Sequence, residues 1–181
     1  ILAAKIMTTC QSAQSVKHYS APIAEALRVS LIKSFVSAFE APPAFSKPFY
    51  KRNNISLNDL NSFICVFGRQ VYGSLSLSCP TGLIHPKVTE LFGTGSPDIQ
   101  SQLVGDYVGE LLNQVAGAFK LALIDQGVIV YIGLPVHLSE GRRSVPHQAA
   151  SSVLCLPFKV AEADCYLEVC LGQLTAPSHQ V

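Results

Sequence analysis

The sequence has no tryptophan, a single methionine and few charges, since Asp, Glu, Lys and Arg make up only 14% of its 181 residues. The net charge is +1 and the lysines and arginines form no basic run. Nothing electrostatic therefore favours binding to nucleic acid or to an anionic membrane. No apolar run reaches the roughly 18 residues of a membrane-spanning helix. The longest candidate, GVIVYIGLPVHL at 127–138, is rich in β-branched residues and is typical of a strand.

Several kinds of chemical site are also missing. The six cysteines contain no C-x-x-C pair, and the five histidines have no zinc-ligand spacing. There is no P-loop and no G-x-S-x-G motif. Five cysteines lie in apolar, strand-like stretches, and a chain of this size does not need disulfides. We therefore interpret them as reduced thiols of a cytoplasmic protein and expect no metal or cofactor in this chain.

Apolar residues, by contrast, are abundant: 49% of the chain is hydrophobic, which is enough for a substantial core. The length fits one domain, since domains hold about 100–200 residues. We place this domain at residues 20–173, between an N-terminal segment (1–19) and a C-terminal tail (174–181). Met7 is one candidate for the natural start, with residues 1–6 as a cloning remnant, and a fragment or a processed terminus is the alternative.

The first predicted helix covers residues 20–39. Ser20 can cap it, Pro22 is tolerated in its first turn, and the prolines of 41–48 end it. Its apolar residues recur at helical spacing and are predicted to face the core: Ile23, Leu27, Leu31, Phe35 and Phe39.

Strands are predicted at 49–52, 63–67 and 71–79, the last two forming a hairpin. The strict alternation in 71–79 predicts two faces. Leu75, Leu77 and Cys79 would point inward, and Ser74, Ser76 and Ser78 outward.

A short helix is expected near 86–92, followed by a long helix from 97 to about 121. Ser96 as N-cap, Pro97 and Asp98 mark its start. Strands follow at 128–136, 153–160 and 165–171, with a polar loop at 139–151 and a hairpin turn at 161–164. The chain thus twice repeats a long helix followed by three strands. This order predicts an α+β fold with antiparallel sheets packed against long helices.

The long helix carries an unusual polar edge. At 100° per residue, five side chains fall within about 80° of one another: Asp106, Glu110, Asn113, Gly117 and Lys120. The apolar residues lie on the opposite side. A solvated face is one interpretation, and a surface contacted by another molecule is the other. Asn is a mediocre helix former and Gly costs about 1 kcal/mol relative to Ala, which favours the second.

The pattern Asp106-x-x-x-Glu110-x-x-Asn113, then Gly117 and a strand reaching Pro135, resembles the signature of the CheC/CheX/FliY chemotaxis phosphatases, and its CheX branch most closely. The segments APIAEALRVSL, VYGSLSLSCP, IGLPVHLSEG, LCLPFKV and CYLEVCL resemble further family elements in the same order, so that the likeness covers roughly residues 20–173. The spacing from Asn113 to Pro135 is one residue shorter than the family pattern, which a deletion near 125–127 explains.

The resemblance implies one active site per chain. The first helix has Ala21 at the position equivalent to Asp106, and Glu25 is followed by Arg28 where the motif has Asn. An Arg cannot offer the carbonyl acceptor of an Asn, so we assign no site there.

The resemblance further implies a hydrolase that removes the aspartyl phosphate of a CheY-type response regulator in chemotaxis or related two-component signalling. Asn113 would orient the attacking water and Glu110 would pair with a lysine of the partner. Asp106, Gly117 and Pro135 would support the motif, with Gly117 giving clearance and Asp106 equally readable as an ordinary surface carboxylate. The partner would supply Mg²⁺, and the protein would be a homodimer. The alternatives are a non-catalytic module that binds a receiver domain or a motor or signalling partner, and a structural domain that assembles through its sheet edges.

Overall fold

The computed structural model describes residues 7–8, 18–19, 21–69, 71–138, 141–147 and 152–173. Ser20, the predicted helix cap, and Cys10, the sixth cysteine, lie outside these residues. The elements follow one another in this order: β1 (Met7–Thr8), β2 (His18–Tyr19), α2 (Ala21–Phe39), β3 (Ala44–Phe45), β4 (Phe49–Lys51), β5 (Leu60–Gly68), β6 (Val71–Cys79), α3 (Thr81–Phe92), α4 (Pro97–Asp125), β7 (Val130–Ile132), β8 (Val136–Leu138), β9 (Val153–Val160) and β10 (Ala163–Gln173).

The strands β3–β10 form one eight-stranded sheet of order β3-β9-β10-β6-β5-β7, in which β4 also pairs with β9 and β8 with β5. Its strand pairings are antiparallel, and β10 pairs with β6 at the centre, with Leu167 opposite Leu77. The strands that precede α4 (β3–β6) and those that follow it (β7–β10) thus join in a single sheet. Strands β1 and β2 pair separately. The predicted α+β class is confirmed.

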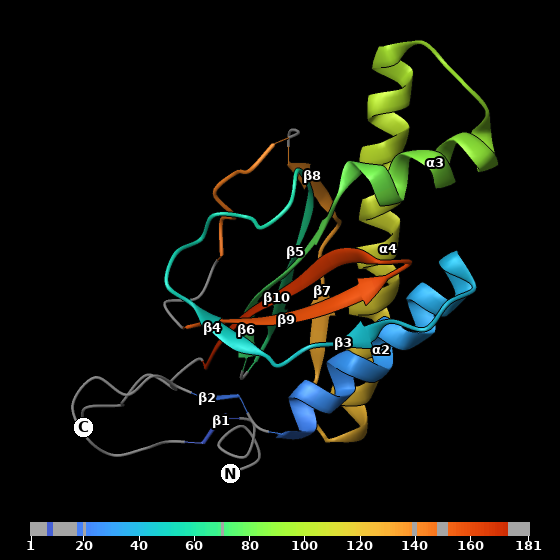
Figure 1. Cartoon of the computed structure of the whole chain (residues 1–181). Helices are drawn as coiled ribbons and strands as arrows, with labels where there is room; N and C mark the ends of the chain where they lie inside the picture. The colour runs from blue at the N-terminus through green and yellow to red at the C-terminus, as the bar shows by residue number, and fades with distance from the viewer. Residues whose placement is uncertain are drawn as a thin grey trace, which may run out of the picture.

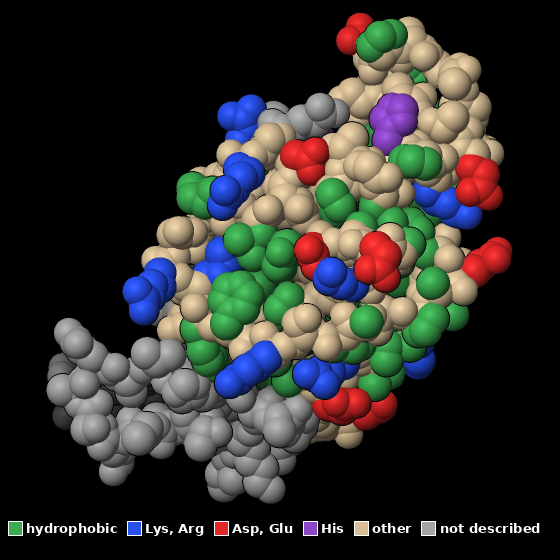
Figure 2. All heavy atoms as spheres, viewed as in Figure 1, with side chains coloured by type: hydrophobic (Ala, Val, Ile, Leu, Met, Phe, Trp, Pro, Cys, Tyr) green, Lys and Arg blue, Asp and Glu red, His purple; other side chains and the backbone are tan. Residues whose placement is uncertain are grey.

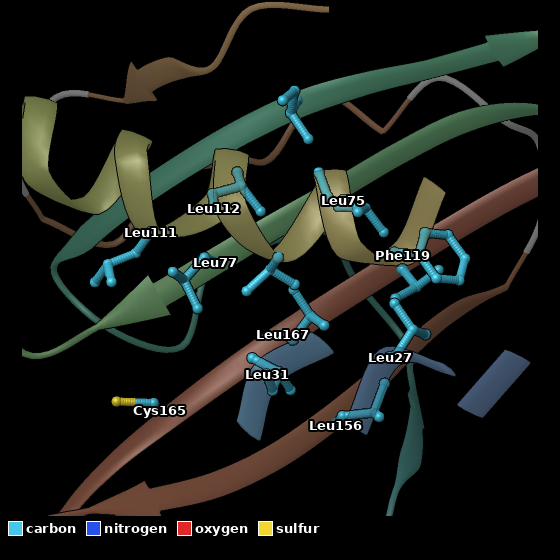
Figure 3. Packing of buried hydrophobic residues seen from close by; sticks show 14 of the residues in the cluster. Leu27, Leu31, Leu75, Leu77, Leu111, Leu112, Phe119, Leu156, Cys165 and Leu167 are labelled. Atoms are coloured by element: carbon cyan, nitrogen blue, oxygen red, sulfur yellow. The ribbon is translucent and has the colours of Figure 1, made fainter. Parts of the chain in front are cut away.

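Helices α2 and α4 lie side by side on one face of the sheet, to the right of it in Figure 1. The hydrophobic core fills the layer between these two helices and the sheet. Figure 3 shows leucines of both helices pointing at the leucines of the central strands. The labelled members are all buried: Leu27 and Leu31 from α2, Leu111, Leu112 and Phe119 from α4, and Leu75, Leu77, Leu156, Cys165 and Leu167 from the sheet. Because burying each leucine contributes roughly 1.5–3 kcal/mol, these contacts anchor both helices.

The boundaries of α4 follow from its sequence. Ser96 is extended at the N-cap, Pro97 occupies the first turn and Asp98 adds the acidic charge that suits a helix N-terminus. The Ser96 side chain makes no capping hydrogen bond. At the other end Gly127 has φ 77° and its amide donates to the Ile124 carbonyl at 2.8 Å. This tight turn is where the sequence predicted the one-residue shortening.

The predicted orientation of the serines in β6 is wrong in one respect. Ser74, Ser76 and Ser78 do point away from the leucines, but all three are at most 1% exposed. The loops 52–59 and 141–147 cover that face of the sheet, opposite the helices (Figure 1). The Asn58 amide, for example, donates to Ser78 Oγ at 2.8 Å. Alternation marked the two faces of the strand, but a polar loop layer buries the second one.

A buried ion pair lies in this second layer. Lys51 Nζ is 2.6 Å from Glu168 Oε1, and His147 Nε2 is 3.1 Å from Glu168 Oε2. His147 Nδ1 lies 3.0 Å from Ser74 Oγ. The side chains of Lys51, His147 and Glu168 are at most 4% exposed. Since Ser74 is buried as well, these contacts tie the loops to the sheet.

The strand predicted at 128–136 is divided. β7 ends at Ile132 and β8 begins at Val136, with Gly133, Leu134 and Pro135 between them. Both strands pair with β5, and the Gly133 amide donates to the Cys65 carbonyl at 2.9 Å. Proline has no amide hydrogen for a sheet ladder, which accounts for the interruption.

Five cysteines are described, and all five are free thiols: Cys65, Cys79, Cys155, Cys165 and Cys170. Cys65 is partly exposed and the other four are buried, as expected for reduced core residues. Burial raises the pKa of the Cys155 thiol to about 12. Of the helices that the structure describes, none combines the length and apolar character needed to cross a bilayer.

Candidate functional site

The polar edge of α4 is presented to solvent. Asp106, Glu110 and Asn113 are exposed, whereas Val108, Leu112 and other residues of the opposite side are buried. The apolar stripe packs on the sheet and leaves the polar stripe outside, as the periodicity predicted. The motif side chains therefore stand on a rigid, anchored helix rather than on a loop.

Glu110 and Asn113 lie on the same edge, three residues apart. The Gln114 amide donates to Glu110 Oε1 at 3.3 Å, and both side chains are exposed. Within the described part of the chain the Asn113 carboxamide makes no side-chain hydrogen bond, so its carbonyl and NH₂ are available to another molecule. A Cβ atom added at Gly117 would meet no atom within 4 Å. The edge is therefore unobstructed around Gly117.

The segment between β7 and β8 flanks this edge on the side of Asn113. A Cβ atom at Gly109 would lie 3.5 Å from Pro135 Cβ. At 100° per residue, Gly109 is about 40° from Asn113 and about 100° from Glu110. Pro135 is thus brought beside the motif helix, where it packs on Gly109. Its neighbour Leu134 is 86% exposed.

A hollow of about 250 Å³ flanks the edge on the side of Glu110. Three helices line it: α2 with Ser37 and Ala38, followed by Glu40 just beyond its end, α3 with Lys87 and Leu91, and α4 with Tyr107, Glu110, Leu111 and Gln114. In Figure 2 acidic groups stand at the right-hand edge of the molecule, over α3 and the end of α2, with a basic group beside one of them. The polar edge thus runs between an apolar turn and a hollow with charged walls.

Two groups at the hollow have shifted pKa values. Lys87 Nζ is 3.1 Å from Glu90 Oε2, and this hydrogen bond raises the pKa of Lys87, with a smaller contribution from Glu40. Burial raises the pKa of Tyr107. Both groups therefore keep their protons at neutral pH, Lys87 as a cation and Tyr107 as a neutral phenol.

Sequence reasoning missed this hollow, because its walls come from three segments far apart in the chain. The sequence also assigned no contact to Lys120, whereas the structure places Lys120 Nζ 6.0 Å above the centre of the Tyr131 ring. A cation over an aromatic face is an attractive contact that no local sequence pattern predicts.

Helix α2 carries no equivalent edge. The Arg28 guanidinium lies 5.3 Å above the centre of the Phe45 ring, where it packs against β3. Glu25 is exposed, but no Asn or Gln accompanies it on this helix. Among the described residues, no group of three or more His, Cys, Asp or Glu side chains could hold a metal ion.

An exposed carboxylate and a free carboxamide on a helix surface cannot by themselves enclose a substrate. A carboxamide can accept a hydrogen bond from water and donate one nearby without adding charge. The fold and this site define an α+β domain that presents a carboxylate and a carboxamide on the exposed side of an anchored helix. The family model for the chemotaxis phosphatase CheX matches residues 61–159, which is more than half of the chain. The protein therefore belongs to this family.

Solved structures share the fold. A CheC-like superfamily protein from Shewanella sp. PV-4 is 25% identical, with TM-score 0.73, and the match covers 84% of this chain and 99% of that one. The chemotaxis protein CheX from Vibrio vulnificus is 24% identical, with TM-score 0.72 and coverage of 84% and 100%. A chain of the CheX–CheY–BeF₃–Mg²⁺ complex from Borrelia burgdorferi is 14% identical, with TM-score 0.69 and coverage of 82% and 97%. No curated protein matches the sequence.

Proposed function

We propose that this protein hydrolyses the aspartyl phosphate of a CheY-type response regulator and that Asn113 and Glu110 carry the reaction. The observation that carries the proposal is the exposed edge of α4, on which the Glu110 carboxylate and the Asn113 carboxamide lie together. Membership in the CheX family supplies the phosphatase class. An edge that projects from the protein suits a reaction centre held by the partner.

The reaction needs a water molecule in line with the phosphorus. The water oxygen attacks phosphorus, the bond to the aspartyl oxygen breaks, and the products are inorganic phosphate and the free carboxylate. Catalysis of phosphoryl transfer depends mainly on positioning and charge stabilisation. The Asn113 carbonyl would accept a hydrogen bond from this water. A neutral amide does so without placing negative charge beside the phosphoryl oxygens.

Glu110 would hold the helix in register by pairing with a lysine of the partner. Gly117 would let the partner approach the helix, and Asp106 and Pro135 would support the edge. The Mg²⁺ ion would be bound by the receiver domain, which is consistent with the Mg²⁺ in the CheX–CheY complex of Borrelia burgdorferi. A cytoplasmic location would give access to such a regulator.

We further propose a homodimer formed through the sheet edge. β7 is the last strand of the sheet path and offers an edge for pairing between chains. Tyr131 on this strand is 57% exposed. The mass in solution tests this part, and a monomer at micromolar concentration would contradict it.

Phosphate release from a phosphorylated CheY-type receiver domain tests the catalytic proposal. The wild-type protein should accelerate release, Asn113→Ala should abolish the acceleration, and Glu110→Lys should weaken binding. Gln102→Ala, an exposed position on the same helix, is the matched control. Full activity in Asn113→Ala would overturn the proposal. Binding without any change in phosphate lifetime would select the non-catalytic receiver-binding module instead.

A further inference from the structure

The hollow beside Glu110 has an electrostatic character of its own. It lies where α2 ends, and Glu40 follows that end directly with φ 55°. The C-terminus of a helix carries partial negative charge from its free carbonyls. The last turn of α2 contains no basic residue that would offset it. Glu40 and Glu110 add two carboxylates to the same walls.

The single lysine that lines the hollow is already engaged. Lys87 Nζ lies 3.1 and 3.3 Å from the two carboxylate oxygens of Glu90, one turn further along α3. Its charge is therefore largely balanced by a partner outside the lining, and the hollow itself remains negative. An anionic group would be repelled from it.

Apart from the polar side chains of Ser37 and Gln114, the remaining walls are apolar or aromatic. Ala38, Leu91 and Leu111 come from the three helices, and the ring of Tyr107 is half-buried among them. Negative charge beside apolar walls suits a side chain with an aliphatic stem and a cationic head, which is the chemistry of Lys or Arg. Glu110 is itself one of the residues that line the hollow.

Resting on the function proposed above, we propose that this hollow receives a second basic side chain, Lys or Arg, from the surface of the receiver domain. Glu40 and Tyr107 are then specificity-determining residues that select among regulators. Asn113 acts on the reacting water and Glu110 on the lysine of the partner's active site. On α4, Tyr107 lies about 60° from Glu110 on the side away from Asn113, so the second contact is separate from the reacting group.

The test measures binding and turnover separately, with a CheY-type receiver domain loaded with Mg²⁺ and BeF₃⁻ for affinity and the phosphorylated form for turnover. Glu40→Gln should raise the dissociation constant about fivefold, and Glu40→Lys at least about tenfold, as expected for loss and reversal of one partly shielded charge pair. The salt dependence of binding should weaken in both. The rate at saturating partner should stay unchanged. Glu25→Gln, an exposed carboxylate on α2, the helix that ends just before Glu40, is the matched control.

The outcomes separate the two proposals. Unchanged affinity in Glu40→Lys, or an equal loss in Glu25→Gln, overturns the basic-side-chain contact while leaving the phosphatase proposal intact. Glu40-dependent binding without phosphate release overturns the phosphatase proposal and leaves the contact intact. A change in oligomeric mass in Glu40→Lys, with unchanged receiver affinity, shows that a second copy of the chain occupies the hollow and also overturns the contact. Urea unfolding of each variant confirms that the comparison is made between folded proteins.

Discussion

The imidazole of His137 lies against the backbone of α4 at Gly105, so closely that a Cβ atom at residue 105 would be 2.7 Å from the ring. One turn further along, Gly109 faces Pro135 with room for such an atom, at 3.5 Å. These two glycines let β8 and the turn before it pack directly on the helix that carries the motif. The contact thus sets the distance between Pro135 and the edge formed by Glu110 and Asn113.

Substitution of the two glycines by alanine should have opposite effects. Gly105→Ala forces the His137 ring and β8 outward and should lower the free energy of unfolding by about 1–3 kcal/mol. Gly109→Ala introduces an ordinary contact and removes the entropic cost of glycine, so it should be neutral or stabilising by up to about 1 kcal/mol. Urea denaturation of both variants measures the difference. Equal destabilisation by the two changes would show that the space between α4 and the β7–β8 segment does not determine the effect of these substitutions.

Gly117 should show a conflict between stability and function. Because its surroundings are open, Gly117→Ala should raise the free energy of unfolding by about 1 kcal/mol. If the glycine gives clearance for the partner, the same variant should bind the receiver domain more weakly. Gly82→Ala in α3, also in open space, should leave receiver binding unchanged and serves as control. Normal binding by Gly117→Ala would leave Gly117 without a docking role.

The buried pair Lys51–Glu168 should be costly to break from one side only. Lys51→Met leaves the fully buried Glu168 carboxylate without its cation and should destabilise the protein by about 3–5 kcal/mol. Adding Glu168→Gln should recover part of this loss, because the uncompensated charge disappears. Lys47→Met, an exposed site before the same strand, should have little effect. A double variant as unstable as Lys51→Met alone would contradict this account.

Stability should fall at alkaline pH. Burial raises the pKa of Cys155 to about 12, from 9.0 for an accessible thiol. The folded state therefore keeps a proton that the unfolded state releases above pH 9. The contribution of the protonated thiol to the stability of the fold is fully present below pH 9 and is lost as pH rises toward 12. The pKa of Cys79 is raised as well, first by its hydrogen bond with Cys165 and then by burial.

The free energy of unfolding, measured between pH 8 and 10.5, should thus decrease by about 2 kcal/mol for Cys155. Cys155→Ala should have a shallower alkaline slope, whatever its stability at pH 8. In the folded protein at pH 8, iodoacetamide should modify Cys65 before the four buried thiols. Rapid modification of Cys155 under these conditions would mean that its site opens locally.

Local patterns in the sequence sufficed for much of the architecture. The spacing of apolar residues determined α2 and α4, the alternation in 71–79 determined a strand of the same bounds, and 153–160 was placed equally well. Ser96, Pro97 and Asp98 determined where α4 begins. The same periodicity set Asp106, Glu110 and Asn113 on one exposed edge. Their chemical roles stay a prediction until the variants are measured.

The tertiary structure decided what each polar side chain faces. The serines of β6 are buried because loops distant in sequence cover them, and the hollow beside Glu110 exists because α2, α3 and α4 converge there. The strand is interrupted at Gly133–Pro135, and there Pro135 packs against Gly109 of α4. Periodicity depends on neighbours within a few residues, so it reports which side of an element is apolar. What covers the other side depends on contacts between segments far apart in the chain, and only the assembled fold contains them.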